Sequence, residues 1–258
     1  MKQTTQTLQL TTKQTEILTL LYRFRFLNRN HIQPLLGHKH HSRILNWLNE
    51  LTDLKLINKS YDKSFVSEPA VYRLDKTGRK YLKDNSKLNI KPLARVWRET
   101  KYSPQLQKHC LFLADTYLSL LDFAAKIKSE LHFNTKTDLY GVANLIDPKP
   151  DAYFALENQT IKRYFLDILD DLPPVILRRR VKAYFKYFDS DEWQDNTDKP
   201  FPDIILICPN NRIKNHLFFY IQNKIDEDSE INFYLSTWET IKQKGLAKEA
   251  LEKVKPKE

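Results

Sequence analysis

The first 84 residues contain the pattern that most restricts the possible fold: three short helical segments, two β-rich runs and a further helix, in that order. The helical segments have apolar residues spaced three or four apart, and the β-rich runs flank a polar loop. The predicted segments are 11–27, 28–36, 39–54, 55–61, 69–74 and a helix that starts at 77. This order is typical of a winged helix-turn-helix, whose third helix enters the major groove of DNA and whose hairpin forms the wing.

Local signals predict the ends of the first two helices. Thr11 or Thr12 is the expected N-cap of the first and Asn28 or Asn30 that of the second, because these side chains accept hydrogen bonds from the first turn. Gly37 is expected to end the second helix, since glycine readily adopts positive φ. The residues expected to face the core are Ile17, Leu20, Leu21, Phe24, Ile32, Leu35, Leu36, Ile44, Leu48 and Leu51.

Positive charge is concentrated in the same part of the chain. Residues 1–108 contain 21 Lys and Arg against 8 Asp and Glu, whereas residues 109–258 contain 21 against 24. A basic surface attracts nucleic acid, because each neutralised phosphate releases condensed counterions. Some winged helices serve instead as protein-interaction modules. The excess of positive charge favours double-stranded DNA as the partner.

Seven side chains of this basic part are candidate DNA contacts: Lys39, His40, Arg43, Asn46, Lys59, Lys63 and Arg73. Arg43 and Asn46 are of the types that pair with the edges of guanine and adenine. The three cationic residues at 59, 63 and 73 are expected to contact phosphates. The cluster His38–His41 lacks a cysteine or carboxylate at a spacing that suits a metal, so we expect partly protonated histidines beside the DNA backbone.

Composition excludes several classes of protein. The four glycines form no phosphate-binding loop, and two cysteines are too few for a disulfide framework or a zinc cluster. The longest apolar run, Ile204–Cys208, is too short to cross a bilayer. The first residues lack the apolar core of a signal peptide. We therefore expect a cytoplasmic protein with no membrane contact.

The predicted organisation is a winged helix in 1–84, a basic linker or arm in 85–105, an α/β domain in 106–247 and a charged, frayed tail in 248–258. The arm either follows the DNA backbone or only connects the domains; its cations are Lys91, Arg95, Arg98 and Lys101. Helices alternate with short strands beyond residue 105, which predicts an α/β sandwich on a mixed sheet.

Two carboxylates lie on consecutive predicted strands of that domain, Asp151 after Pro150 and Asp167 on the next strand. Such a pair could hold Mg²⁺ against a phosphate. The pattern resembles the PD-(D/E)xK nuclease core, a restriction-endonuclease-like fold, but Leu169 occupies the position of its catalytic lysine. Lys182, on the following helix, is the candidate substitute. Alternatively, Asp151 caps a turn and Asp167 is a buried carboxylate, and the missing lysine favours a protein without cleavage activity.

The helix around residues 178–186 is basic within an otherwise acidic half. Arg179 and Lys182 are its best candidates for DNA contact. The alternative is that its Lys and Arg side chains only face water. In that case the residues packed on the sheet are Val181, Tyr184, Phe185 and Phe188.

Seven segments together carry a resemblance to a known family: Leu10–Leu18, Tyr72–Gly78, Lys108–Leu111, Pro150–Ala152, Phe165–Asp170, Arg178–Tyr184 and Phe201–Leu206. They resemble the replication-relaxation family of plasmids and integrative elements over nearly the whole chain. The family usually has Glu-x-Asp on the acidic strand, whereas here Asp167 and Asp170 are one residue further apart. The resemblance implies DNA binding in plasmid relaxation, replication or transfer, with a relaxase or other transfer proteins as further partners.

Three functions follow from these observations. The favoured one is a DNA-binding accessory protein of a mobile genetic element. The second is a nuclease that uses Mg²⁺ at Asp151 and Asp167. The third is a winged-helix transcriptional regulator whose second half forms a homodimer or binds a ligand.

Overall fold

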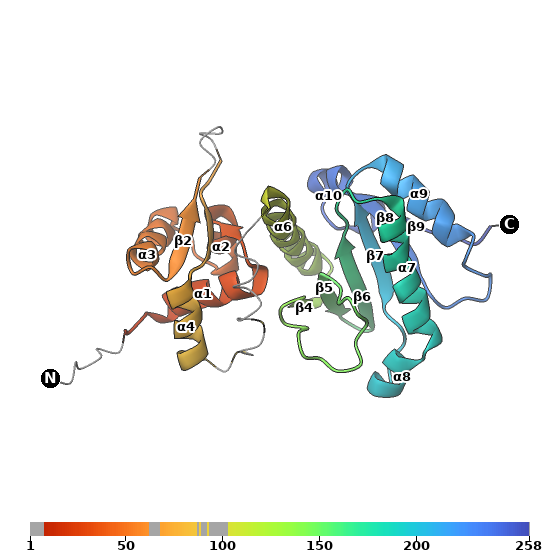
Figure 1. Cartoon of the computed structure of the whole chain (residues 1–258), viewed down its shortest axis with the longest axis horizontal. Coiled ribbons are helices and arrows are strands. Elements are labelled where there is room, and N and C mark those ends of the chain that lie inside the picture. The colour runs from red at the N-terminus through yellow and green to blue at the C-terminus, as the bar shows by residue number, and fades with distance from the viewer. Residues whose placement is uncertain (1–7, 62–67, 87, 89–91, 93–102, 258) are drawn as a thin grey trace. The chain divides into compact units, whose positions relative to one another are not determined.

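The computed structural model describes residues 8–61, 68–86, 88, 92 and 103–257 (Figure 1). Residue contacts divide the chain into two compact units, Met1–Leu111 and Phe112–Glu258. The cations predicted at positions 63, 91, 95, 98 and 101 lie outside the described residues.

The first unit is a winged helix, as predicted. Its sheet has the strand order β1-β3-β2, and both strand pairs are antiparallel. The elements are α1 (Thr12–Phe24), β1 (Leu27–Asn28), α2 (Arg29–Leu35), α3 (His41–Asp53), β2 (Ile57–Ser60), β3 (Val71–Leu74) and α4 (Lys76–Asn85). The sequence pattern did not predict β1, whose two residues pair with the central strand β3.

Two reciprocal caps start the first helices. The Thr11 hydroxyl accepts from the backbone N–H of Gln14 at 3.3 Å, and the Gln14 side chain accepts from the N–H of Thr11 at 2.9 Å. Asn28 and His31 make the same exchange at the start of α2, at 3.2 Å in each direction. These partners confirm Thr11 and Asn28 as caps. Gly37 follows α2 with a φ of 61°, as expected.

Two predicted helix boundaries were wrong. The first helix ends at Phe24 rather than at 27, because Arg25 has a φ of 71° that a right-handed helix does not tolerate. The third begins at His41, so Lys39 and His40 precede α3. The backbone of His40 is extended, and its N–H donates to Nδ1 of His38 at 3.2 Å, which stabilises the turn before the helix.

The predicted core of this unit is largely confirmed. The fully buried side chains come from all three helices and include Ile17, Leu21, Phe24, Ile32, Ile44, Leu48 and Leu51. Leu20 and Leu35 are only half-buried, contrary to expectation. Both line a groove beside α1 and α2 instead of the interior.

The second unit is built on a six-stranded mixed sheet, with the order β4-β5-β6-β7-β8-β9. The neighbours β6-β7 and β7-β8 are parallel and the other pairs are antiparallel. The strands are β4 (Glu130–Thr135), β5 (Ala152–Glu157), β6 (Ile161–Ile168), β7 (Asp203–Cys208), β8 (Phe233–Thr237) and β9 (Glu252–Lys253). The helices are α6 (Pro104–Lys126), α7 (Pro174–Asp189), α8 (Glu192–Thr197), α9 (Asn211–Gln222), α10 (Trp238–Lys244) and a 3₁₀ turn at Lys248–Ala250.

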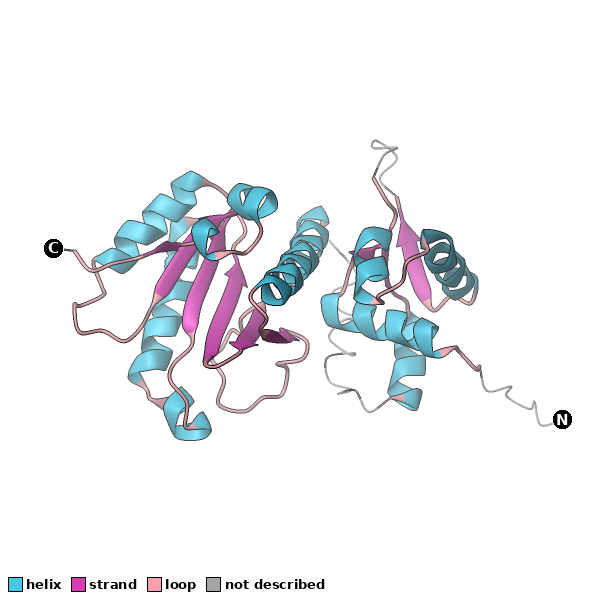
Figure 2. Ribbon diagram, turned by 180° about the vertical axis from the view of Figure 1, so that it is seen from behind, coloured by secondary structure: helices cyan, strands magenta, loops and turns pink. Residues whose placement is uncertain are grey.

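Helices cover both faces of this sheet, which confirms the predicted α/β layering. Figure 1 shows α7 and α9 in front of the strands, and the reverse view in Figure 2 shows α6 and α10 over the other face. Phe165 and Phe233 pack with Val181 and Tyr184 beneath α7. No helix in the described part of the chain combines the length and the apolar content needed for a membrane span.

The expectation of a frayed C-terminal tail was wrong for residues 248–257. Strand β9 pairs with β8, and Val254 is 2% exposed. The backbone N–H of Val254 also donates to the carbonyl of Phe233 at 2.9 Å. Two buried apolar side chains, Ala250 and Val254, and a short strand therefore keep this charged segment packed on the second unit.

We predict that Gly78→Ala destabilises the protein. In most helices this change stabilises, but a Cβ at position 78 would overlap the backbone carbonyl oxygen of Leu56, which cannot move without shifting the start of the hairpin. We expect a loss of about 1–3 kcal/mol in the free energy of unfolding, measured by urea denaturation. The control is Lys80→Ala, at an exposed position on the same helix. A Gly78→Ala variant as stable as the wild type would contradict the close approach.

Candidate nucleic-acid interface

The exposed side of α3 carries the two predicted base-reading residues. Arg43 and Asn46 are exposed and three residues apart, so they share one side of the helix, while Ile44 and Leu48 are buried beneath it. The Arg43 guanidinium lies 5.9 Å from the centre of the Trp47 ring. This cation–π contact restricts the long side chain while leaving it in contact with solvent.

The N-terminal end of α3 adds to the positive character of this side. No side chain caps the first turn, and none of its residues is acidic. Lys39 and His40 are exposed immediately before it. Free backbone N–H groups and the helix dipole favour an anion at such an end, and nearby cations reinforce this preference.

The two candidate cations of the hairpin that the structure describes, Lys59 and Arg73, lie on opposite faces of it. Lys59 pairs with Tyr72 across the strands, and its ammonium lies 5.0 Å from the ring centre of Tyr61 and 6.0 Å from that of Tyr72. A hydrogen bond with Tyr61 raises the pKa of Lys59, so the lysine is fully charged at neutral pH. Arg73 pairs with Asn58 and therefore points to the opposite face of the ribbon.

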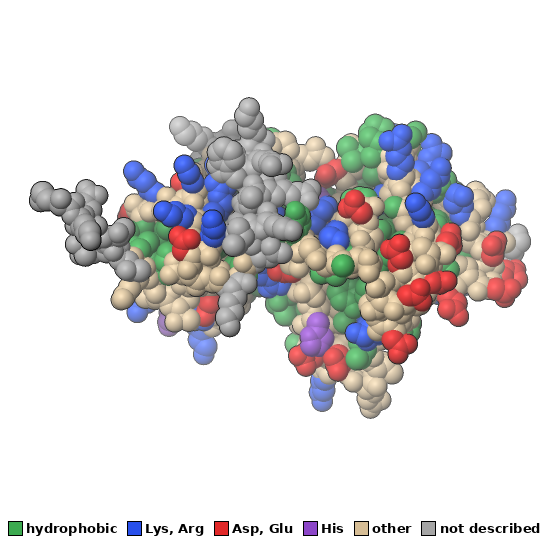
Figure 3. Space-filling model, turned by 60° about the horizontal axis from the view of Figure 1, so that its bottom comes forward, with side chains coloured by type: hydrophobic (Ala, Val, Ile, Leu, Met, Phe, Trp, Pro, Cys, Tyr) green, Lys and Arg blue, Asp and Glu red, His purple; other side chains and the backbone are tan. Residues whose placement is uncertain are grey.

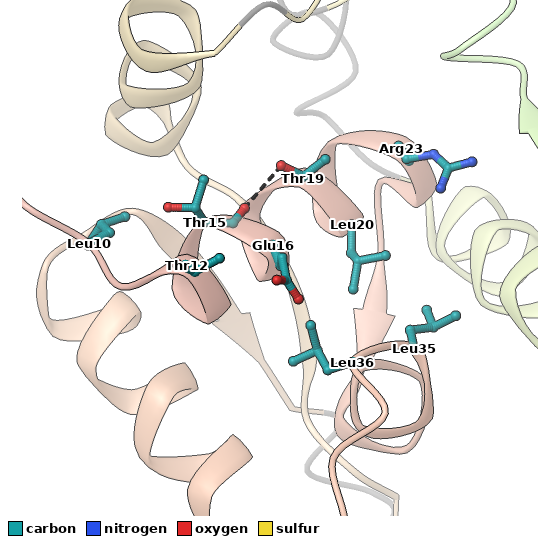
Figure 4. Close-up of a pocket in the computed structure, with 9 residues that line it drawn as sticks. All are labelled: Leu10, Thr12, Thr15, Glu16, Thr19, Leu20, Arg23, Leu35 and Leu36. Carbon is teal, nitrogen blue, oxygen red and sulfur yellow. Dashed lines mark hydrogen bonds between the residues drawn. The ribbon is translucent and has the colours of Figure 1, made fainter.

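Figure 3 shows Lys and Arg side chains spread over the visible face of the first unit, with few acidic ones among them. A groove of about 520 Å³ on this unit, shown in Figure 4, contains none of the predicted DNA contacts. It is lined by Leu10, Thr12, Thr15, Glu16, Thr19, Leu20, Arg23, Leu35 and Leu36. Its acidic member, Glu16, pairs with Lys13 at 2.7 Å, and Arg23 is the one cation among the described residues of the groove.

The structure brings the two predicted carboxylates of the second unit together. The backbone N–H of Asp151 donates to Oδ1 of Asp167 at 3.3 Å, and Oδ2 of Asp151 accepts from the N–H of Ile168 at 2.9 Å. Lys136 lies 3.7 Å from the other oxygen of Asp151. The two acids thus tie the start of β5 to the end of β6.

Arg180 and Tyr184 occupy the remaining acceptor positions of Asp167. The Arg180 guanidinium donates through Nη2 to Oδ1 at 3.0 Å and through Nε to Oδ2, and the Tyr184 hydroxyl donates to Oδ2 at 2.9 Å. A carboxylate has about four lone-pair sites, and each of those on Asp167 has a donor. The side chain of Asp167 is 6% exposed and that of Arg180 is 11% exposed.

The charges in this cluster stabilise one another. Burial, the largest single effect, lowers the pKa of Arg180, but the charge and hydrogen bond of Asp167 together with Tyr184 and Asp151 outweigh it, so the net pKa is raised. The pKa of Tyr184 is raised well above its usual value, first by burial and then by Asp167. Arg180 is therefore a permanent cation and Tyr184 a neutral donor at any physiological pH.

This arrangement does not fit Mg²⁺. A metal ligated by Asp167 would have to displace the guanidinium, which already supplies the positive charge. Among the described residues, no three His, Cys, Asp or Glu side chains form a group able to hold a metal. The predicted substitute, Lys182, is exposed and lies two residues from Arg180, on the opposite side of α7. The metal and catalytic roles of Asp151, Asp167 and Lys182 stay a prediction that this geometry does not favour.

The sequence interpretation placed Tyr184 on the sheet but missed that Arg180 and Tyr184 are the partners of Asp167. It treated the run Arg178–Arg180 as one basic patch and selected Arg179, which is exposed. The available signal was the spacing: Leu177, Val181 and Tyr184 mark the buried side of α7, and Arg180 lies on that side, four residues before Tyr184.

The geometry defines a two-unit protein with an N-terminal winged helix and a helix-covered mixed sheet. Its sequence matches the replication-relaxation family over residues 18–204. The chain belongs to the replication-relaxation family.

Solved structures similar to part of the chain include bacterial regulators. The zinc-responsive MarR family member ZitR of Lactococcus lactis is 19% identical, with a TM-score of 0.28 over 46% of this chain and 78% of that one. The adhesin competence repressor AdcR of Streptococcus pyogenes is 15% identical, with a TM-score of 0.28 over 46% of this chain and 84% of that one. At these TM-scores the likeness does not define the fold of this chain. No curated protein matches it.

We predict that Arg180→Gln strongly destabilises the protein, because it leaves the buried carboxylate of Asp167 without its cation. The expected loss is about 3–5 kcal/mol in the free energy of unfolding, measured by urea denaturation. Arg179→Gln removes the same charge from an exposed neighbouring position and should change stability by less than about 0.5 kcal/mol. Adding Asp167→Asn to Arg180→Gln should recover part of the loss. Equal stability of the two single variants would show that the ion pair has no structural role.

Proposed function

We propose that this protein is a DNA-binding accessory protein of a mobile genetic element that acts in plasmid relaxation, replication or conjugative transfer. The single observation that carries the proposal is the exposed, uncapped and cationic side of α3 in a winged helix. Membership of the replication-relaxation family supports the same role. Relaxases or other transfer proteins are the expected further partners.

The proposed mode of binding places α3 in the major groove of a duplex. Arg43 and Asn46 contact base edges, and the free N–H groups at the start of α3 meet a phosphate. Lys39, His40 and Lys59 neutralise neighbouring phosphates. Arg73, on the other face of the hairpin, is the weakest of the described candidates.

The cleavage alternative has less support. It requires a divalent cation at Asp151 and Asp167, where the guanidinium of Arg180 already binds the second carboxylate. The resemblance of the second unit to a nuclease core therefore rests on the sequence pattern of its paired acids. We expect the wild type and an Asp151→Ala variant to nick supercoiled DNA equally little with Mg²⁺ or Mn²⁺.

We predict steep salt dependence of duplex binding. If four or more cations each neutralise a phosphate, the affinity should fall by about 100-fold or more between about 50 mM and about 200 mM salt. Fluorescence anisotropy with a labelled duplex measures this slope. Equal affinity at the two salt concentrations would remove the electrostatic basis of the proposal.

We predict that Arg43→Ala lowers both the affinity for the recognised duplex and the sequence preference. A bidentate contact to guanine contributes about 1–3 kcal/mol of discrimination, so the preferred site should lose about fivefold or more relative to a scrambled duplex. Lys13→Ala removes one charge from α1, where the ammonium pairs with Glu16, and should leave the preference unchanged. A competition assay with the two duplexes compares the variants. Unchanged discrimination in Arg43→Ala would contradict base contact by α3.

A further inference from the structure

Two neighbouring helices make one side of the second unit basic, although the unit as a whole is slightly acidic. Helices α7 and α9 pack together and contain seven Lys and Arg but one acid, Asp189 at the end of α7. Three of the seven cations have carboxylate partners. Arg180 binds Asp167, Arg212 lies 3.5 Å from Asp171, and Lys214 lies 2.6 Å from Glu252.

Four cations are left facing outward: Arg178, Arg179, Lys182 and Lys186. None of them forms an ion pair with a carboxylate of the described residues. The last three are exposed and follow helical spacing, so they form a row about 10 Å long on the outer side of α7. Toward its upper right, Figure 3 shows Lys and Arg side chains in a row beside exposed hydrophobic ones, with the acidic side chains gathered apart from them.

Aromatic rings lie beside these cations on α9. Phe219 is 60% exposed, an unusual position for so large an apolar side chain. The next residue, Tyr220, has the Arg178 guanidinium 5.7 Å from its ring centre and the Lys224 ammonium 5.8 Å away. Cations and one exposed ring, that of Phe219, thus occur together on the surface formed by α7 and α9, while the half-buried Tyr220 ring holds Arg178 and Lys224 beside it.

We propose that this α7–α9 surface binds single-stranded DNA. Single-strand sites combine cations that neutralise the backbone with aromatic side chains on which unpaired bases stack. In a duplex the faces of the bases are covered by their neighbours, so stacking on Phe219 would first require unstacking, whereas a single strand offers free base faces without that cost. The inference rests on the proposed DNA-binding function and adds to it a second site with a different form of DNA.

The test compares two probes on the full chain by fluorescence anisotropy, an oligothymidylate and a duplex of about 20 nucleotides per strand. Phe219→Ala should weaken oligothymidylate binding about fivefold or more and leave duplex binding unchanged, whereas Phe219→Trp should retain both, because tryptophan also stacks. The triple variant Arg179→Gln, Lys182→Gln, Lys186→Gln should reduce the single-strand salt slope by about two.

Matched controls separate this surface from general charge and from the winged helix. Lys199→Gln, Lys242→Gln, Lys244→Gln removes as many exposed cations from other parts of the second unit and should leave the slope nearly unchanged. Arg43→Ala should affect the duplex alone. Thermal melting of each variant checks that the fold is intact.

The outcomes distinguish the two proposals. Three results would overturn the single-strand site. Oligothymidylate binding could be unchanged by Phe219→Ala, or it could fall equally in both triple variants. It could also be lost in Arg43→Ala, which would place the bound strand on the winged helix. An apolar protein partner at Val175 and Ile176, which are 52% and 46% exposed, would give the first of these results. Failure of the wild type to bind the duplex, with Phe219-dependent binding of the single strand intact, would instead overturn the proposed duplex function alone.

Discussion

The ion pair between Arg180 and Asp167 determines how α7 lies on the sheet, and the surface of the second unit follows from it. A buried carboxylate without a cation is strongly unfavourable, so Asp167 on β6 requires a donor from the helix above it. Arg180 and Tyr184 meet this requirement from one side of α7. Because a helix has a fixed periodicity, Arg179, Lys182 and Lys186 must then face solvent. One internal ion pair therefore selects which cations of a basic helix reach a ligand.

In the first unit, the burial of apolar side chains determines which side of α3 faces solvent. Ile44, Leu48 and Leu51 turn one side of α3 inward, which leaves Arg43 and Asn46 on the other side. Arg43 and Asn46 are proposed to contact bases because they lie on the exposed side of the helix, and this role requires no shifted pKa. In both units, the proposed DNA binding depends on which exposed cations are free to meet phosphates. The affinity then comes from the counterions that the phosphates release.

Much of the winged helix could be predicted because its signals are local. The caps at Thr11 and Asn28, the glycine at 37 and the apolar spacing of α3 act within a few residues of one another. Strand β1 was missed, since two residues carry no periodicity and pair with a strand far along the chain. The pattern also placed Lys39 and His40 on α3, because it does not contain the turn stabilised by His38.

The carboxylate cluster was predictable in part. Asp151 and Asp167 were expected to be neighbours because they lie on consecutive strands, and they are hydrogen-bonded. Their partner was missed because three arginines follow one another. The helical spacing indicates that Arg180 lies on the buried side of α7, but only the tertiary structure shows that it meets Asp167 there. Tertiary packing is also needed to recognise β9, because only two buried residues, Ala250 and Val254, distinguish a segment whose composition otherwise resembles a solvated tail.

Hydrogen–deuterium exchange of the full chain with and without a bound duplex tests the central claim, that the first unit reads DNA through α3. The account predicts slower exchange in residues 39–60 on addition of the duplex, with the backbone of α1 little changed. Protection confined to the groove along α1 and α2, or to the second unit, would contradict it.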